Sequence, residues 1–228
     1  AFALALGLSF TNWRLGSPLP MRYVGFEQYA LLLGDAAFQR ALINNILFAA
    51  VVVPVQTVLA LALALALNRP LRGMPLFRTL FFMPVVFPMS LVAVVWELLY
   101  APGPDGPVNT VLHTLSLGAL GPYDYLHHTW LALPAIMVLS IWQGLGFQMV
   151  ILLAGLQSIP VALYEVAALN GANAWQRLRY VTLPQLRNPL VFTGLITTVL
   201  SFRLFAQVDI LTQGGPLNST VTLMYLAV

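Results

Sequence analysis

The sequence predicts an all-α integral membrane protein, first of all from its composition. Of its 228 residues, 60% are hydrophobic and 7% are charged, whereas a soluble domain carries about 25% charged residues. Uncharged stretches cover residues 41–68, 79–96 and 129–164, each close to or beyond the ~18 residues that indicate a membrane helix. An isolated apolar segment satisfies its backbone in lipid only as a helix, so a helical bundle is expected.

Six apolar segments are expected to cross the membrane, at about 1–10, 42–67, 76–100, 130–156, 190–211 and from 221 onward. The first and the last are expected to be incomplete spans, because the sequence begins and stops inside an apolar run. Pro84 and Pro88 are expected to bend the third span. External loops rich in breakers, such as Pro102 and Gly103, are expected to be turns or short loops. The whole chain, 1–228, is thus predicted to be a single transmembrane domain.

Two residue types are missing from the chain, and their absence restricts its chemistry. All ten basic residues are arginine, so no Walker A loop with its phosphate-binding lysine is present and any ATPase must be a separate polypeptide. No cysteine occurs, and His113, His127 and His128 lack the spacing of a metal clamp. The spans carry neither a catalytic dyad nor an HExxH helix. We therefore expect no enzymatic activity, no catalytic residues, no cofactor and no metal.

The arginines predict the orientation of the chain in the bilayer. Six lie in the loops that follow the second and fourth spans, namely Arg69, Arg72, Arg78, Arg177, Arg179 and Arg187. The opposite side carries three, Arg14, Arg22 and Arg40. By the positive-inside rule the side with six is cytoplasmic. Because the arginines are scattered among short loops, orientation explains them better than a nucleic-acid partner does.

The loop at about 157–189 carries the most specific spacing in the chain. Its pattern is Tyr164-Glu165-Val166-Ala167-Ala168, then Asn170-Gly171-Ala172, then Val181-Thr182-Leu183-Pro184. The pattern resembles the cytoplasmic signature of ABC importer permeases, in which EAA, three residues, G and nine residues precede I-x-L-P. Val166, Asn170 and Val181 depart mildly from that signature and leave its spacing unchanged.

The resemblance implies that this loop is the coupling helix that docks in the ATPase subunit. The residues that would couple to the ATPase are Tyr164, Glu165, Ala167, Ala168, Asn170, Gly171, Ala172, Leu183 and Pro184. Physically, the pattern predicts a helix that begins near Pro160, a turn with positive φ at Gly171, and a second short helix that ends before Pro184. A re-entrant amphipathic loop on the membrane surface is the alternative.

Four further segments extend the resemblance to the binding-protein-dependent carbohydrate permeases: 23–29, 67–73, 155–160 and 211–216. The resemblance implies a six-helix transmembrane core in the bacterial inner membrane, which imports a sugar or sugar derivative. It also implies an ATPase subunit, a second permease and an extracytoplasmic solute-binding protein as partners. A permease for glycerol phosphate esters or another small polar solute is one alternative. An ion-coupled secondary transporter is another, but it needs carboxylates near mid-membrane, whereas Glu97 and Asp209 lie near the outer interface.

Two helical stripes predict the path of the substrate. They are Ser140, Gln143, Gly144 and Phe147 in the fourth span, and Thr197, Leu200, Ser201 and Leu204 in the fifth, with Arg203 beside them. In each span the four stripe residues stand at i, i+3, i+4 and i+7 and so share one face. Sugar hydroxyls need hydrogen-bond partners, and sugar rings stack on aromatic surface. Close helix packing by small residues is the alternative interpretation, and Arg203 either lines a cavity or contacts another helix.

Overall fold

The structure is a computed structural model that describes residues 2–13, 20–68 and 73–228. Within these ranges the chain forms helices joined by turns and loops, together with one isolated antiparallel bridge between Thr11 and Tyr23. The predicted all-α class is confirmed. Three of the arginines that predict the orientation, Arg14, Arg69 and Arg72, lie outside the described residues.

Two long helices form the centre of the bundle. α3 (Ala36–Leu67) has 32 residues and α7 (Ala132–Gln157) has 26, and each is long and apolar enough to cross a membrane alone. At 1.5 Å per residue they reach roughly 48 and 39 Å, more than the ~30 Å of a hydrocarbon core. They confirm the second and fourth expected spans. α3 begins before the apolar run, because the Asp35 side chain accepts a hydrogen bond from the Ala37 amide at 2.9 Å and caps the helix.

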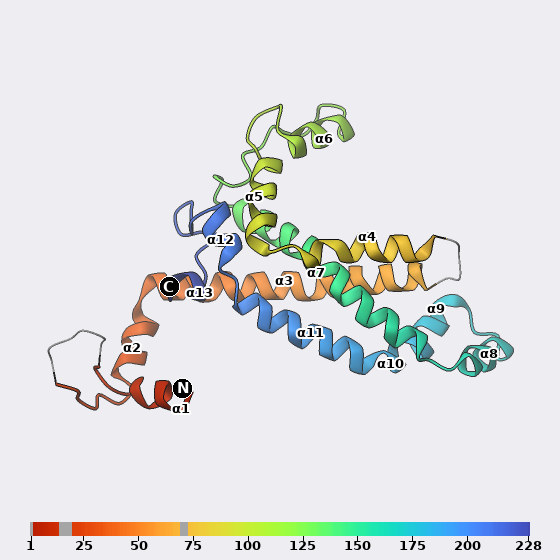
Figure 1. Cartoon of the computed structure of the whole chain (residues 1–228), viewed down its shortest axis with the longest axis horizontal. Helices are drawn as coiled ribbons and strands as arrows, with labels where there is room; N and C mark the ends of the chain where they lie inside the picture. Colours follow the sequence, from red (N-terminus) through yellow and green to blue (C-terminus); the bar gives the residue numbers. More distant parts are fainter. Residues whose placement is uncertain (1, 14–19, 69–72) are drawn as a thin grey trace.

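The third expected span is broken into two helices. α4 (Met74–Val86) and α5 (Met89–Leu99) meet at 100°. The bend expected from Pro84 and Pro88 is therefore a full break, because Pro88 has no N–H to continue the ladder and forces Phe87 into an extended conformation (ψ 139°). α5 turns away from the direction of α4 as a result and packs against α12, whereas α4 continues along α7 (Figure 1).

The fifth expected span is also two helices, which corrects the prediction of one continuous helix over 190–211. α11 (Arg187–Phe202) ends before Arg203, and α12 (Ala206–Leu211) begins three residues after Arg203. Side chains from elsewhere bond the carbonyls at this break. Asn45 donates to the Ser201 carbonyl at 3.0 Å, and Thr222 donates to the Leu204 carbonyl at 2.6 Å.

The shorter helices lie mostly outside the bundle. They are α1 (Phe2–Leu8), α2 (Glu27–Gly34), α6 (Pro107–Leu115) and α13 (Leu223–Leu226). α6 corrects the prediction that the loop over 101–128 consists of turns and short loops, because Pro107 occupies the first turn of a helix, where its missing N–H costs nothing. α1 and α2 stand apart from α7 and α11, and α6 follows α5 away from the bundle (Figure 1).

Two apolar clusters hold the long helices together. One gathers around Phe48, Ile136 and Val208 near the breaks, and the other joins α3, α7 and α11 toward their opposite ends. Between them α4 and α7 touch through their backbones, since a Cβ on Gly146 would collide with the Phe81 carbonyl oxygen. Only glycine permits that crossing.

The coupling elbow and the candidate substrate path

The segment from 160 to 186 folds into an elbow at one end of the bundle. α8 (Val161–Leu169) begins directly after Pro160 and is followed by a turn in which Gly171 has φ +76°. Both features confirm the geometry predicted from the spacing. The chain then returns through α9 (Ala174–Arg177), a π-helical turn η1 (Leu178–Thr182) and α10 (Leu183–Gln185) (Figure 1).

The second helix of the elbow does not end before Pro184, which corrects the sequence prediction. The Leu183 amide donates to the Leu178 carbonyl, and the Leu186 amide donates to the Thr182 carbonyl at 3.0 Å. The π-turn widens the hydrogen-bond ladder just before the proline. Pro184, which has no N–H, therefore lies inside the helical path.

Two sets of hydrogen bonds that the sequence analysis missed fix the shape of the elbow. Asn173 accepts from the Gln176 amide at 2.9 Å, and Gln176 accepts from the Asn173 amide at 2.8 Å, which forms a capping box. The Tyr164 hydroxyl bonds the Thr182 hydroxyl at 3.0 Å and ties α8 to η1. The Asn-x-x-Gln spacing could have revealed the capping box from sequence.

The predicted coupling residues come together on this elbow, mostly at its surface. Exposed are Glu165, Ala168, Asn170, Gly171 and Pro184, and half-buried are Tyr164, Ala167, Ala172 and Leu183. α8 has no buried residue, and its apolar Leu169 is 88% exposed. A helix that buries so little within its own chain presents an apolar surface for another molecule to cover.

The predicted path residues of α7 face α3 and the α4–α5 break. Gln143 is 8% exposed and donates to the Phe87 carbonyl at 3.2 Å. The Gln56 amide of α3 lies against Gly144. Ser140 donates to the Ile136 carbonyl one turn back at 2.8 Å, and Phe147 is half-buried. The stripe therefore lines the inner side of the break.

The predicted path residues of α11 divide into buried and exposed groups. Thr197, Ser201 and Leu204 are buried, and Gln148 of α7 donates a short hydrogen bond to the Thr197 hydroxyl. Their burial fits the packing alternative. Leu200, at 54% exposure, and Arg203 are open.

Arg203 follows the C-terminal end of α11 and is exposed. The 16 residues of α11 rise roughly 24 Å, so Arg203 lies about that far along the helix from Arg187. An arginine that faced hydrocarbon would require water or protein beside it rather than lipid. The break also places Arg203 and Asp209 on different segments.

The histidines of the external loop make local contacts. His127 Nδ1 lies 3.0 Å from Asp124 Oδ1. Burial raises the pKa of Asp124, but the hydrogen bonds that His127 donates outweigh it and hold that pKa below its usual value. Within 2–13, 20–68 and 73–228, no three His, Cys, Asp or Glu side chains are grouped to hold a metal ion.

Comparison with known proteins decides which transport class this architecture represents. A family described as binding-protein-dependent transport system inner membrane component matches residues 56–227, which include the whole elbow and both stripes. The chain belongs to this family. This inner membrane component is 34% identical to the lactose transport system permease protein LacF of Rhizobium radiobacter, over 91% of this chain and 70% of the relative.

Other relatives agree with that membership. The trehalose/maltose transport system permease protein MalF of Thermococcus litoralis is 33% identical over 90% of this chain and 68% of its own. A bacterial alginate ABC transporter, solved in complex with an alginate-bound periplasmic protein, shares the fold with a TM-score of 0.77 at 22% identity, covering 96% of this chain and 73% of that one. The inner membrane component is thus a permease subunit rather than an enzyme, and the ion-coupled alternative is set aside.

Proposed function

We propose that this permease forms half of the translocation path of an ATP-driven importer that takes up a sugar or sugar derivative. The functions of relatives support a carbohydrate, since lactose, trehalose/maltose and diacetylchitobiose permeases each share about a third of their aligned residues with this chain. A second permease would complete the path. A solute-binding protein would deliver the solute from outside, as the periplasmic protein in the alginate complex suggests.

The elbow carries the coupling to a separate ATPase subunit in this proposal. The observation behind it is the exposed apolar surface of α8, held in one orientation by the Gly171 turn and by the bond between Tyr164 and Thr182. Closure of the ATPases on ATP would push α8, and the elbow would pass that movement to α7 and α11 as a rigid-body displacement. The permease then switches between inward-facing and outward-facing states.

The path runs along α7 and α11 in the same proposal. Gln143 and Ser140 would bond sugar hydroxyls, and Phe147 would stack on a ring. On α11 the open positions Leu200 and Arg203 would line the path, and the buried Thr197 and Ser201 would support them from behind. Gly144 and Leu204 would fix the spacing of the two helices.

Gly171→Asp tests the coupling role directly. Aspartate is strained at φ +76° and adds charge to the docking surface, so the ATPase should no longer co-purify and ATP-dependent uptake should fall at least tenfold. Gly194→Ala is the matched control, because Gly194 lies within α11 without a positive φ, and an added Cβ would meet no atom within 4 Å. Unchanged co-purification and unchanged uptake in Gly171→Asp would sink the coupling assignment.

An anionic solute is the second candidate, and Arg203 is the observation that favours it. A sulfoquinovosyl glycerol transport system permease of Agrobacterium fabrum is 34% identical to this chain, and the exposed Arg203 beside the proposed path would stabilise a negative charge there. Direct binding of neutral sugars, sulfonated sugars and glycerol phosphate esters to the solute-binding protein encoded beside this permease would separate the candidates. If only anionic solutes bind, Arg203→Gln should abolish uptake.

A further inference from the structure

The helices α5 and α6 form an arm that follows the break after α4, and the inner face of α5, with Val92 and Ala93, packs into the core. The 13 residues of α4 rise roughly 20 Å from the elbow end before the break. The 100° bend then turns α5 across the direction of α4, so the arm runs sideways. α7, which is long enough to cross a membrane alone, follows the arm in the chain and precedes the elbow. The arm and the elbow therefore lie at opposite ends of this span.

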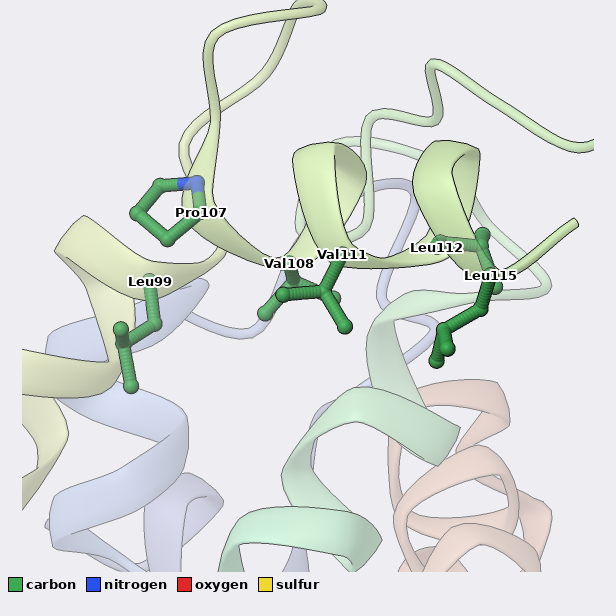
Figure 2. A pocket seen from close by; sticks show the side chains of 6 residues that line it. All are labelled: Leu99, Pro107, Val108, Val111, Leu112 and Leu115. Carbon is green, nitrogen blue, oxygen red and sulfur yellow. The ribbon is translucent and has the colours of Figure 1, made fainter. Parts of the chain in front are cut away.

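α6 has one apolar face and one polar face. Val108, Val111, Leu112 and Leu115 stand at i, i+3, i+4 and i+7, and with Leu99 and Pro107 they line a cavity of about 300 Å³. Figure 2 shows Val108, Val111 and Leu115 projecting from the same side of the helix. Leu115 is 80% exposed and Val111 is 58% exposed. Their own chain leaves these two side chains uncovered, whereas Val108 and Leu112 are half-buried.

The polar face of α6 is occupied by its own loop, which fixes the rotation of the helix. Asn109 is 1% exposed and donates to the carbonyls of Gly103 at 3.0 Å and Tyr123 at 2.8 Å. Its side-chain oxygen accepts from the Tyr123 amide at 2.9 Å. Thr110 adds a bond to the Pro104 carbonyl at 3.1 Å. Turning the apolar face inward would break all of these bonds, so that face stays outward.

The apolar face continues the membrane surface of the protein. Along α5, Leu91 and Leu98 are 53% and 67% exposed, and this surface leads directly to Leu99 and the cavity. Trp130, which precedes α7, is 81% exposed, as is typical of the aromatic residues that mark a membrane interface. α6 carries no Arg, Lys, Asp or Glu, and His113 in its last turn is its one basic residue.

We propose that α6 is an interfacial helix seated in the leaflet opposite the elbow, with phospholipid acyl chains filling the cavity between α5 and α6. The helix lies in the membrane with its apolar face toward the chains and its polar face toward its own loop and water. This inference rests on membership of a membrane-component family and on the place of α6 before the α7 span, and it does not depend on which solute is carried.

Site-directed spin labelling tests the proposal, because the chain has no cysteine of its own. Val111→Cys and Leu115→Cys report on the apolar face, and Thr110→Cys and Thr114→Cys are matched controls on the polar face of the same helix. Each labelled permease would be assembled with its partner subunits in phosphatidylethanolamine–phosphatidylglycerol vesicles. Collision rates would then be measured with oxygen, which concentrates in lipid, and with a water-soluble nickel chelate.

Labels at 111 and 115 should collide several-fold more with oxygen than with nickel, and labels at 110 and 114 should show the reverse. Equal nickel access on both faces would place α6 in water and overturn the proposal. Low access to both reagents at 111 and 115 would instead show a protein covering the face, which also overturns it. Repeating the measurement with and without the solute-binding protein would identify that protein as the cover.

Discussion

The two ends of the bundle differ in how far the chain covers its own exposed groups. At the elbow, α8 buries none of its residues, and its surface is left for another molecule. At the other end, the breaks in the third and fifth spans are closed from within, because Gln143 bonds the Phe87 carbonyl and Asn45 bonds the Ser201 carbonyl. The comparison indicates that the elbow keeps an apolar surface free for assembly, whereas the groups at the breaks are satisfied within the single chain. Mutations at the breaks should therefore affect mainly folding, and mutations at the elbow should affect mainly assembly.

The largest effect on folding is expected from Asn45→Leu. Asn45 is fully buried, donates to the Ser201 carbonyl at 3.0 Å and accepts from the Leu223 amide at 2.7 Å. Leucine leaves both groups unsatisfied at roughly 1–3 kcal/mol each, or about 2–6 kcal/mol in total. Thermal unfolding of the detergent-solubilised permease should shift strongly downward. Asn170→Ala on the exposed elbow is the control, and a shift no larger than in that variant would contradict internal closure of the break.

A smaller effect on folding but a large one on transport is expected from Gln143→Leu combined with Ser201→Ala. The Phe87 carbonyl loses its partner, which costs roughly 1–3 kcal/mol, while Ser201 loses only a bond to the Thr197 carbonyl one turn back. Uptake should fall at least tenfold, with assembly and basal ATP hydrolysis retained. Thr198→Ala removes the same kind of back-bond, to the Gly194 carbonyl, beside the proposed path and should transport normally. Uptake at the parental rate in the double variant would mean that the path does not run here.

The smallest effect is expected from Tyr164→Phe, which removes the hydroxyl that bonds Thr182 at 3.0 Å. One partly buried hydrogen bond contributes roughly 0.5–1.5 kcal/mol, so thermal stability should barely change. Because the bond joins α8 to η1, its loss should lower uptake per ATP hydrolysed by a few-fold. Thr182→Val should reproduce the result. A large loss of thermal stability in Tyr164→Phe would show that the elbow also supports the fold, contrary to the comparison above.

Apolar length was sufficient to predict the central helices from sequence. α3 and α7 need only a long uncharged run to be helices in lipid. Pro160 and Gly171 were sufficient to predict the start of α8 and the turn after it, but not the π-helical turn before Pro184. The third span was partly predictable, because Pro88 indicates a bend but not its angle. α6 was predictable in principle, since Val108, Val111, Leu112 and Leu115 repeat at helical spacing after Pro107. The surrounding Pro and Gly residues directed the interpretation toward loops instead.

The break in the fifth span could not be predicted from its own residues. The donor to the Ser201 carbonyl is Asn45, which is 156 positions away in the chain, and a local pattern contains no information about it. The division of the α11 stripe into buried and exposed positions could not be predicted for the same reason, because it depends on contacts with another helix. Spacing places Thr197 and Leu200 on one face, but only the packing of Gln148 against Thr197 shows which of them is covered.

The glycine contacts of α7 have a mechanical consequence. Gly155 lies where a Cβ would come within 2.9 Å of Leu186 and Pro189, at the root of the elbow, and Gly146 meets the Phe81 backbone nine residues further back. The neighbours of Gly155 are side chains, whose torsions yield under load, whereas the direct backbone contact at Gly146 leaves little to compress. α7 should therefore pass a displacement to α4 more stiffly than it receives one from the root of the elbow.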